Sequence, residues 1–152
     1  MKNAIVIALY LAVLTGCSEK KISANIEFID PDGLVKAPMF HQVAISTGTA
    51  TIHVAGQTAM DAELNIIGKG DFKAQTAKAW EHVAIALKAA GTSMDNIVSS
   101  HVFVVGLKPE MVRDLMEVMA DSSVPAHAFS TIGVEALAAP GLLIEISAVA
   151  VK

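Results

Sequence analysis

The carboxylate of Glu145 is the first candidate for chemistry, because it interrupts the otherwise apolar segment from Leu142 to Val149. Strand alternation would place it on one face together with Leu143, Ser147 and Val149. A carboxylate in such surroundings can hold a water molecule and accept a proton from it, as a general base does. The alternative is a solvent-facing glutamate on an edge strand, since carboxylates are rarely buried in full.

Five histidines are the other candidates for chemistry, and they are His41, His53, His82, His101 and His127. They are spread over different predicted elements and lack the close pairing of a helical zinc motif, so we predict no metal site. His41 and His53 could approach each other across a predicted hairpin, although solvated or hydrogen-bonded histidines explain them equally well. The sequence contains neither a Gly-x-Ser-x-Gly nucleophile elbow nor a phosphate-binding loop.

Cys17 is the only cysteine, and it ends a segment that is typical of a bacterial lipoprotein signal. After a basic start, residues 4–14 are almost entirely apolar, and Leu14-Thr15-Gly16-Cys17 is similar to a lipobox. We therefore expect residues 1–16 to be a cleaved signal peptide and residues 17–24 to be a tether whose lipid is joined to Cys17. An uncleaved membrane anchor is disfavoured, because about 20 apolar residues are needed to cross a bilayer.

This signal predicts a location in the bacterial cell envelope, where the lipid on Cys17 links the protein to the membrane. Ser18, which stands where an aspartate would favour retention, suggests sorting to the outer membrane, facing the periplasm. Lysine and arginine together number 11 against 15 acidic residues, which gives a net charge of −4 at pH 7. No basic run is present that could neutralise several phosphates, so a nucleic-acid partner is not expected.

Residues 25–152 have the pattern of one domain. The segment from Asn25 to Pro38 combines the turn signal Asp30-Pro31-Asp32-Gly33 with only brief apolar pieces, and it predicts no strand. The predicted elements are strands 43–46 and 51–55 paired as a hairpin, a helix over 72–90, a strand over 97–105, a helix that begins near Pro109, and strands 129–134 and 142–151. Asp71 should cap the first helix, and Gly91 should end it.

This order predicts an α/β (α+β) domain with a mixed sheet. Right-handed crossovers place consecutive helices on the same side, so both helices should cover one face and leave the other uncovered. The strands are too apolar for that second face to meet water alone. We therefore expect another copy of the chain to cover it in a homo-oligomer.

Several segments of the chain resemble the YjgF/Rid family, the reactive-intermediate (enamine/imine) deaminases. The matching segments are Val54-Ala55-Gly56-Gln57, Asp71-Phe72-Lys73-Ala74-Gln75, Val102-Phe103-Val104, Ile132-Gly133-Val134 and the closing run Leu143 to Ala150. The resemblance implies a chorismate-mutase-like fold, a homotrimer, and small-molecule ligand clefts at the subunit interfaces. It implies no metal or organic cofactor.

In its deaminating members, 2-imino acids are hydrolysed to 2-keto acids and ammonia. The resemblance implies that Glu145 corresponds to the strand glutamate that positions the attacking water. The arginine that grips the substrate carboxylate corresponds to Phe129, which is followed by Ser130. A phenylalanine cannot form the bidentate charged contact that a guanidinium makes with a carboxylate.

Two further positions of the implied ligand cleft also depart from the family. Its tyrosine corresponds to Phe40, and its Ser-Gly-Gln segment reads Ala55-Gly56-Gln57, so two hydroxyl groups are missing. The cleft should therefore be more apolar than that of a typical deaminase. We expect a deaminase-like hydrolase that binds or hydrolyses a small imine or enamine other than an ordinary 2-imino acid. The alternative is a non-catalytic trimeric module that binds a ligand or another protein.

Overall fold

The computed structural model describes residues 24–32, 38, 40–41 and 43–152. The predicted signal peptide (1–16), Cys17 and the tether up to residue 23 lie outside the described residues. None of the helices in the described part of the chain has both the length and the apolar character that a membrane crossing requires.

Four strands form a mixed sheet in the order β3-β6-β4-β5. Their bounds are Thr51–Gln57 for β3, Ile144–Val151 for β6, Ile97–Val105 for β4 and Ala128–Val134 for β5. β6 runs antiparallel to both of its neighbours, whereas β4 and β5 are parallel. The last strand of the chain therefore lies inside the sheet, and the alternative of an edge strand around Glu145 is wrong.

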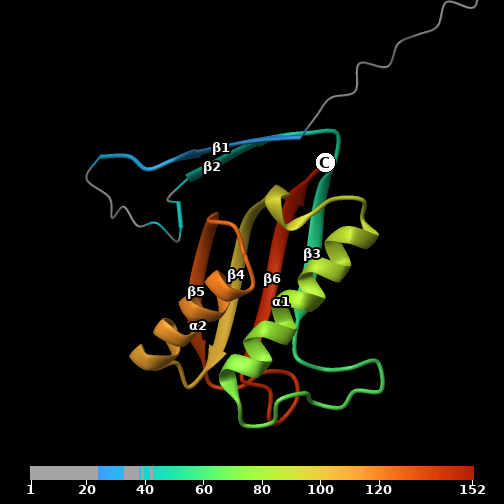
Figure 1. Cartoon of the computed structure of the whole chain (residues 1–152), viewed down its shortest axis with the longest axis vertical. Coiled ribbons are helices and arrows are strands. Elements are labelled where there is room, and N and C mark those ends of the chain that lie inside the picture. Colours follow the sequence, from blue (N-terminus) through green and yellow to red (C-terminus); the bar gives the residue numbers. More distant parts are fainter. Residues whose placement is uncertain (1–23, 33–37, 39, 42) are drawn as a thin grey trace, which may run out of the picture.

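Two helices, α1 (Phe72–Ala89) and α2 (Pro109–Asp121), cover one face of this sheet (Figure 1). Asp71 caps α1 as predicted, because its side chain accepts a hydrogen bond from the backbone N–H of Ala74 at 3.0 Å. Gly91 follows the helix with a φ of +77°, a conformation that glycine adopts without strain. The predicted fold class, with two helices on one face of a mixed sheet, is confirmed.

The hydrophobic core fills the space between the helices and the face that they cover. Its members include Ala79, Val83 and Leu87 of α1, Leu115 and Met119 of α2, Val102 and Val104 of β4, and Ile144, Ile146 and Ala148 of β6. Burial of these aliphatic side chains stabilises the domain by removing apolar surface from water. A short 3₁₀ helix, η1 (Met94–Asn96), leads from α1 into β4.

The first two strands, β1 (Asn25–Ile29) and β2 (Val43–Thr47), form a separate antiparallel pair across one end of the sheet (Figure 1). The predicted hairpin between 43–46 and 51–55 is wrong, because β2 pairs with β1 while β3 pairs with β6. The prediction also missed β1, whose five residues were assigned to a loop.

The reason for this difference lies at Gly48. A Cβ atom there would lie 2.7 Å from the carbonyl oxygen of Lys152, so only glycine allows this close approach to the end of β6. Thr49 and Ala50 donate backbone hydrogen bonds to the same carbonyl, at 2.5 Å and 3.1 Å. The chain is thus directed along β6 when it leaves β2, and does not turn back along β2.

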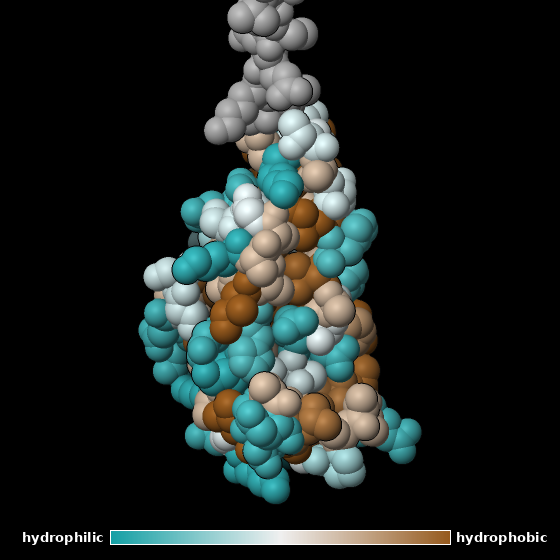
Figure 2. Space-filling view, turned by 90° about the vertical axis from the view of Figure 1, so that its right-hand side faces the viewer, coloured by the Kyte–Doolittle hydropathy of each residue, from teal (hydrophilic) through white to brown (hydrophobic). Residues whose placement is uncertain are grey.

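The uncovered face of the sheet is more polar than the strand sequences suggested. Its residues on β4 and β6 are Ser99, His101, Phe103, Val105, Glu145, Ser147 and Val149, all at least partly exposed. Figure 2 shows the side of the molecule that carries α1 and β3, where apolar side chains lie among polar ones. The expectation of a sheet face too apolar for water therefore holds only in part.

Candidate functional site

Glu145 lies near the start of β6, on the face that the helices leave uncovered. Its register partner on β4 is Phe103, and the next pair along this face joins Ser147 to His101. The predicted placement of Glu145 and Ser147 on one face is confirmed. Because β6 is bonded on both sides, the backbone under this half-buried carboxylate is held in place.

Gly56 leaves the space that the Glu145 side chain occupies. A Cβ atom at Gly56 would lie 2.0 Å from Oε1 and 2.5 Å from Cδ of Glu145. The β3–β6 register shifts between Val54 and Gln57, and this irregularity sets Gly56 against the carboxylate. The Gln57 amide turns back and donates to the carbonyl of Ala55 at 3.1 Å. The predicted segment Ala55-Gly56-Gln57 therefore lies beside Glu145.

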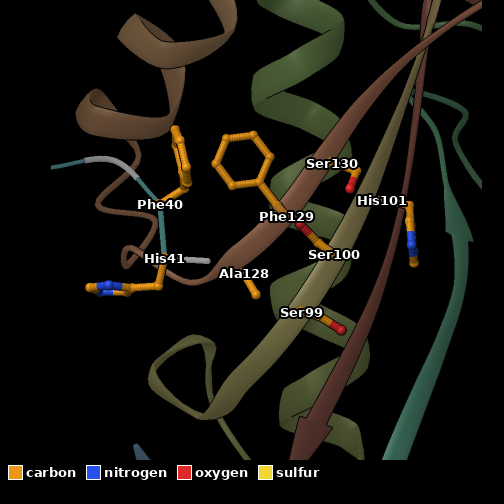
Figure 3. A pocket seen from close by; sticks show the side chains of 8 residues that line it. All are labelled: Phe40, His41, Ser99, Ser100, His101, Ala128, Phe129 and Ser130. Atoms are coloured by element: carbon orange, nitrogen blue, oxygen red, sulfur yellow. The ribbon is translucent and has the colours of Figure 1, made fainter. Parts of the chain in front are cut away.

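Phe40, Phe129 and Ser130 lie together elsewhere, in a pocket of about 250 Å³ at the start of β5 (Figure 3). The rings of Phe40 and Phe129 meet edge to face, with their centroids 5.9 Å apart. A single β-bridge to His127 holds Phe40 against the sheet. The remaining residues that line the pocket are His41, Ser99, Ser100, His101 and Ala128.

The lining of this pocket carries no permanent positive charge. Its polar side chains are serine hydroxyls and imidazoles, and none of the described residues that line it is a lysine or an arginine. Hydroxyl and imidazole groups can hydrogen-bond a neutral ligand, but they lack the paired charged donors of a guanidinium. The described residues of this lining thus offer a carboxylate no permanently charged partner.

The register separates Phe129 from Glu145. Phe129 pairs with Ser100, which is 2% exposed on the helix-covered face, and it packs against the core. Ser130 pairs with His101, which is exposed on the same uncovered face as Glu145. One chain therefore places the predicted water-positioning residue and the position of the missing arginine on opposite faces of the sheet.

His127, which directly precedes β5, is fully buried. Its Nε2 atom lies 2.7 Å from Oγ of Ser100, and its Nδ1 atom lies 2.7 Å from the carbonyl oxygen of Pro125. Burial lowers the pKa of His127 below 6.5, the carbonyl of Pro125 opposes this shift, and His41 adds to it. Sequence analysis missed this pair, because 27 residues separate Ser100 and His127 until β4 and β5 align them.

Two of the other histidines have hydrogen-bond partners of their own. His41 Nδ1 lies 2.9 Å from a carboxylate oxygen of Asp30, and His82 Nδ1 lies 2.8 Å from the carbonyl oxygen of Thr58. The hairpin that would have brought His41 towards His53 is absent. Within the described ranges, no three histidine, cysteine, aspartate or glutamate side chains gather as metal ligands would.

A further positioning residue is Gln75, whose side chain is wholly buried. Its Oε1 atom accepts a hydrogen bond from the N–H of Leu143 at 2.9 Å, and its Nε2 atom donates to the carbonyls of Gly141 at 3.0 Å and Gly68 at 3.2 Å. These bonds tie α1 to the segment that enters β6, two residues before Glu145. Helical spacing marks Gln75 as buried but gives no sign of these partners.

Comparisons with known proteins agree with this architecture. Residues 34–152 match the family model described as Endoribonuclease L-PSP. A RutC family protein of Sulfurisphaera tokodaii is 35% identical over 78 residues, which are 51% of this chain and 60% of that protein. The matched region thus spans less than two thirds of this relative.

Two solved structures extend the comparison. YyfB of Yersinia pestis, a Rid family protein of unknown function, is 30% identical, with a TM-score of 0.78 over 84% of this chain and 99% of that chain. RidA from an Antarctic Psychrobacter is 25% identical, with a TM-score of 0.60 over 78% of this chain and 92% of that chain. The resemblance to the YjgF/Rid family seen in the sequence is confirmed.

Proposed function

The chain belongs to the Endoribonuclease L-PSP family, with the YjgF/Rid proteins, and from this premise we propose that it binds or hydrolyses a small reactive imine or enamine. The observation that carries this proposal is the placement of Glu145 in a space that only Gly56 leaves open. Because the sheet holds this carboxylate in place, the side chain does not have to be ordered before it positions a water molecule against a ligand.

The proposed reaction is the addition of water to a carbon–nitrogen double bond. Glu145 accepts a proton from water while the oxygen bonds to the imine carbon, and the nitrogen takes up a proton. In the collapse of this adduct, Glu145 gives the proton that it holds to the nitrogen and takes the proton of the hydroxyl group, which it then releases to solvent. The carbon–nitrogen bond breaks, ammonia or an amine leaves, and a carbonyl product remains. An enamine enters the same route after it takes up a proton at carbon and becomes an imine.

The substrate is proposed to lack the carboxylate of an ordinary 2-imino acid. Phe129 stands in place of the arginine, and the pocket around it contains two phenyl rings, hydroxyls and imidazoles. A carboxylate that enters such a pocket loses water without gaining a charged partner. A neutral imine or enamine with a small apolar group suits this lining better.

We propose further that the ligand cleft lies between subunits of a homotrimer. Glu145 and Phe129 face opposite sides of one sheet, so residues from both regions meet at one ligand only when different chains contribute them. The uncovered face supplies both polar and apolar surface for such a contact. A mass of three chains by light scattering would support this assembly, whereas a monomer at micromolar concentration would contradict it.

Export and anchoring form a separate part of the proposal, supported by the sequence up to Cys17. The mature domain is proposed to face the periplasm, held by lipid on Cys17 at the outer membrane. Cys17→Ser removes the thiol that the lipid would join, so the protein should leave the membrane fraction or remain uncleaved. Unchanged partitioning of the variant would refute lipid anchoring.

The activity is tested with a neutral imine and with 2-iminobutyrate, each supplied to purified wild type and to Glu145→Gln. The wild type should hydrolyse the neutral imine faster than the carboxylate, and Glu145→Gln should lower that rate by about 100-fold or more. Ser147→Ala, two residues along the same face, serves as the matched control. Rapid turnover of 2-iminobutyrate that survives Glu145→Gln would contradict both the substrate class and the role of Glu145.

The second candidate function is a non-catalytic module that binds a ligand or another protein. The observation that favours it is Phe129 itself, because the described residues that line its pocket include no lysine or arginine to take the role of the arginine of the deaminases. Binding of a neutral imine analogue without any Glu145-dependent turnover would support this alternative. Cleavage of RNA is not proposed, because the net charge is −4 and no basic run is present.

A further inference from the structure

Leu64 is the most exposed large apolar side chain among the described residues, at 73% exposure. It lies between β3 and α1 in a turn of residues 60–66, the Leu64 turn, which an isolated β-bridge between Met60 and Ile66 closes. Its backbone is left-handed, with a φ of +67°, a conformation that is strained for a bulky side chain. The turn thus holds a leucine out in water where a glycine or an asparagine would fit with less strain.

Asp61 fixes the Leu64 turn in this shape. Its Oδ1 atom accepts hydrogen bonds from the backbone N–H groups of Glu63 at 3.0 Å and Asn65 at 2.7 Å, and its Oδ2 atom accepts one from the Asn65 side-chain amide at 3.1 Å. The N–H of Leu64 donates to the backbone carbonyl of Asp61 at 3.1 Å. A partner that buries Leu64 therefore does not first have to order the turn.

A hollow of about 490 Å³, the α2 hollow, lies where β4 leads into α2. Leu107, Pro109 and Val112 give it an apolar lining, and Lys108 is the one charged residue among the described residues that line it. Val112 is 38% exposed, although it belongs to the apolar stripe of its helix. An aliphatic side chain that enters the hollow would remove apolar surface from water on both sides.

The Leu64 turn and the α2 hollow carry opposite charge. Asp61 and Glu63 are acidic, whereas the hollow contains Lys108 and the N-terminal end of α2. Lys108 is the N-cap residue and makes no side-chain hydrogen bond to the helix, so the first N–H groups of α2 favour a carboxylate. Glu110 is the single acidic residue of that first turn. An acidic turn that carries a leucine therefore complements this hollow in both charge and polarity.

The two surfaces lie on different sides of one chain. The Leu64 turn follows β3, at one edge of the sheet, while the hollow lies towards β5, at the other edge (Figure 1). Leu107 of the hollow packs beside Gly133 of β5, where a Cβ atom would lie 3.1 Å from the Leu107 Cβ. Leu64 and Val112 both remain exposed in the structure. The turn and the hollow can therefore meet only when they come from different copies.

We propose that copies of this chain join head to tail, with Leu64 of one copy in the α2 hollow of the next and Glu63 paired with Lys108. The contact is heterologous, because each copy offers the turn to one neighbour and the hollow to another. It is separate from the contact proposed for the uncovered sheet face, which contains none of these residues. It also does not depend on the chemistry proposed for Glu145.

The test couples carboxylates directly to amines with a carbodiimide, in full-length protein mixed from light and heavy isotope-labelled preparations. An isopeptide bond between Glu63 and Lys108 should appear with one light and one heavy peptide, as located by mass spectrometry. Leu64→Asn, which suits a left-handed backbone, should reduce the yield of this mixed pair by about ten-fold or more. Ile85→Asn, at an isoleucine of α1 that is 57% exposed, serves as the matched control and should leave the yield unchanged.

Two results of this experiment would overturn the proposal. One is the absence of a mixed pair, and the other is an equal yield of the mixed pair from Leu64→Asn. A trimer held by the uncovered face alone would give the first result, so the two contacts are told apart.

Charge reversal gives a second reading of the same contact. Glu63→Lys and Lys108→Glu should each weaken association, measured by sedimentation velocity over a series of concentrations, because each substitution brings like charges together. The chain that carries both substitutions should recover, since the pair is restored in the opposite sense. If the double variant does not recover, although circular dichroism shows it to be folded, Glu63 and Lys108 are not paired and the proposal fails.

Discussion

The two faces of the four-stranded sheet differ in what holds their side chains. On the covered face, Ile144 and Ile146 are fully buried against the helices, and the one polar pair described above, Ser100 with His127, is hydrogen-bonded internally. On the opposite face, Glu145 and Ser147 are partly exposed and rest on the same backbone. Alternate residues of β6 therefore pack against the helices on one face and reach solvent on the other.

The residues that the resemblance assigns to the ligand cleft therefore fall into two groups, one on each face of the sheet. The resemblance assigns Gly56 and Glu145 to the ligand cleft. These two residues lie together on the face that the helices leave uncovered. Phe129, which the resemblance places at the position of the arginine, lies on the covered side, where it packs against the core and lines the pocket.

The largest expected effect contrasts two neighbours on β6. Ile146→Ala removes a side chain with 0% exposure and should lower the free energy of unfolding by about 2–5 kcal/mol. Ser147→Ala, one residue later on the uncovered face, should change it by less than about 0.5 kcal/mol. Urea denaturation of both variants measures the contrast. Similar losses would show that the two faces do not differ as described.

The next prediction concerns the contact between Gly56 and Glu145. Gly56→Ala places a methyl group where the Glu145 side chain lies, and because the backbone at Gly56 is not left-handed, the cost should come from this collision. We expect a loss of about 1–3 kcal/mol in the wild-type background. With Glu145→Ala also present, the loss should fall below about 0.5 kcal/mol.

Thermal or urea unfolding of the four proteins in this cycle gives the coupling energy between the two positions. An equal cost of Gly56→Ala in both backgrounds would show that Glu145 does not occupy the space above the glycine. The imine assay adds a functional reading, since a displaced carboxylate should lose turnover in Gly56→Ala even where the fold is retained.

The sequence predicted the elements whose signals are local. The spacing of Val83 and Leu87, the Asp71 cap and Gly91 placed α1 correctly, since each acts within a few residues. Alternation along β6 placed Glu145 on the correct side relative to Ser147. The pairing of β2 could not be predicted in the same way, because two strands competed for it and the outcome depends on a backbone contact with Lys152.

The residues assigned to the candidate ligand cleft came from the family resemblance and not from a local pattern in the sequence. The structure places Gly56 against Glu145 and Phe40 against Phe129, while the assignment of these residues to a ligand cleft stays a prediction. No pattern in the sequence indicated that Phe129 and Glu145 face opposite sides, since that follows from the parallel register of β4 and β5. Contacts that form across strands, such as Ser100 with His127, have no local signal.

The smallest expected effect tests the covered face through its buried histidine. Burial lowers the pKa of His127 from 6.5, so below pH 6.5 the unfolded chain binds a proton that the folded protein does not. The stability that His127 contributes is therefore complete above pH 6.5 and falls as the pH drops below it. The loss should grow as the pH falls, with a limiting slope of about 1.4 kcal/mol per pH unit.

The control for this prediction is His127→Gln, which keeps a hydrogen-bonding side chain but cannot titrate. Its stability should depend less on pH between about 7.5 and 5.5 than that of the wild type. An NMR titration of the wild-type imidazole signals reads the same group directly, and the pKa of the His127 ring should lie below that of an ordinary histidine. If its pKa is instead that of an ordinary histidine, the covered face does not exclude charge, and its contrast with the face that carries Glu145 fails.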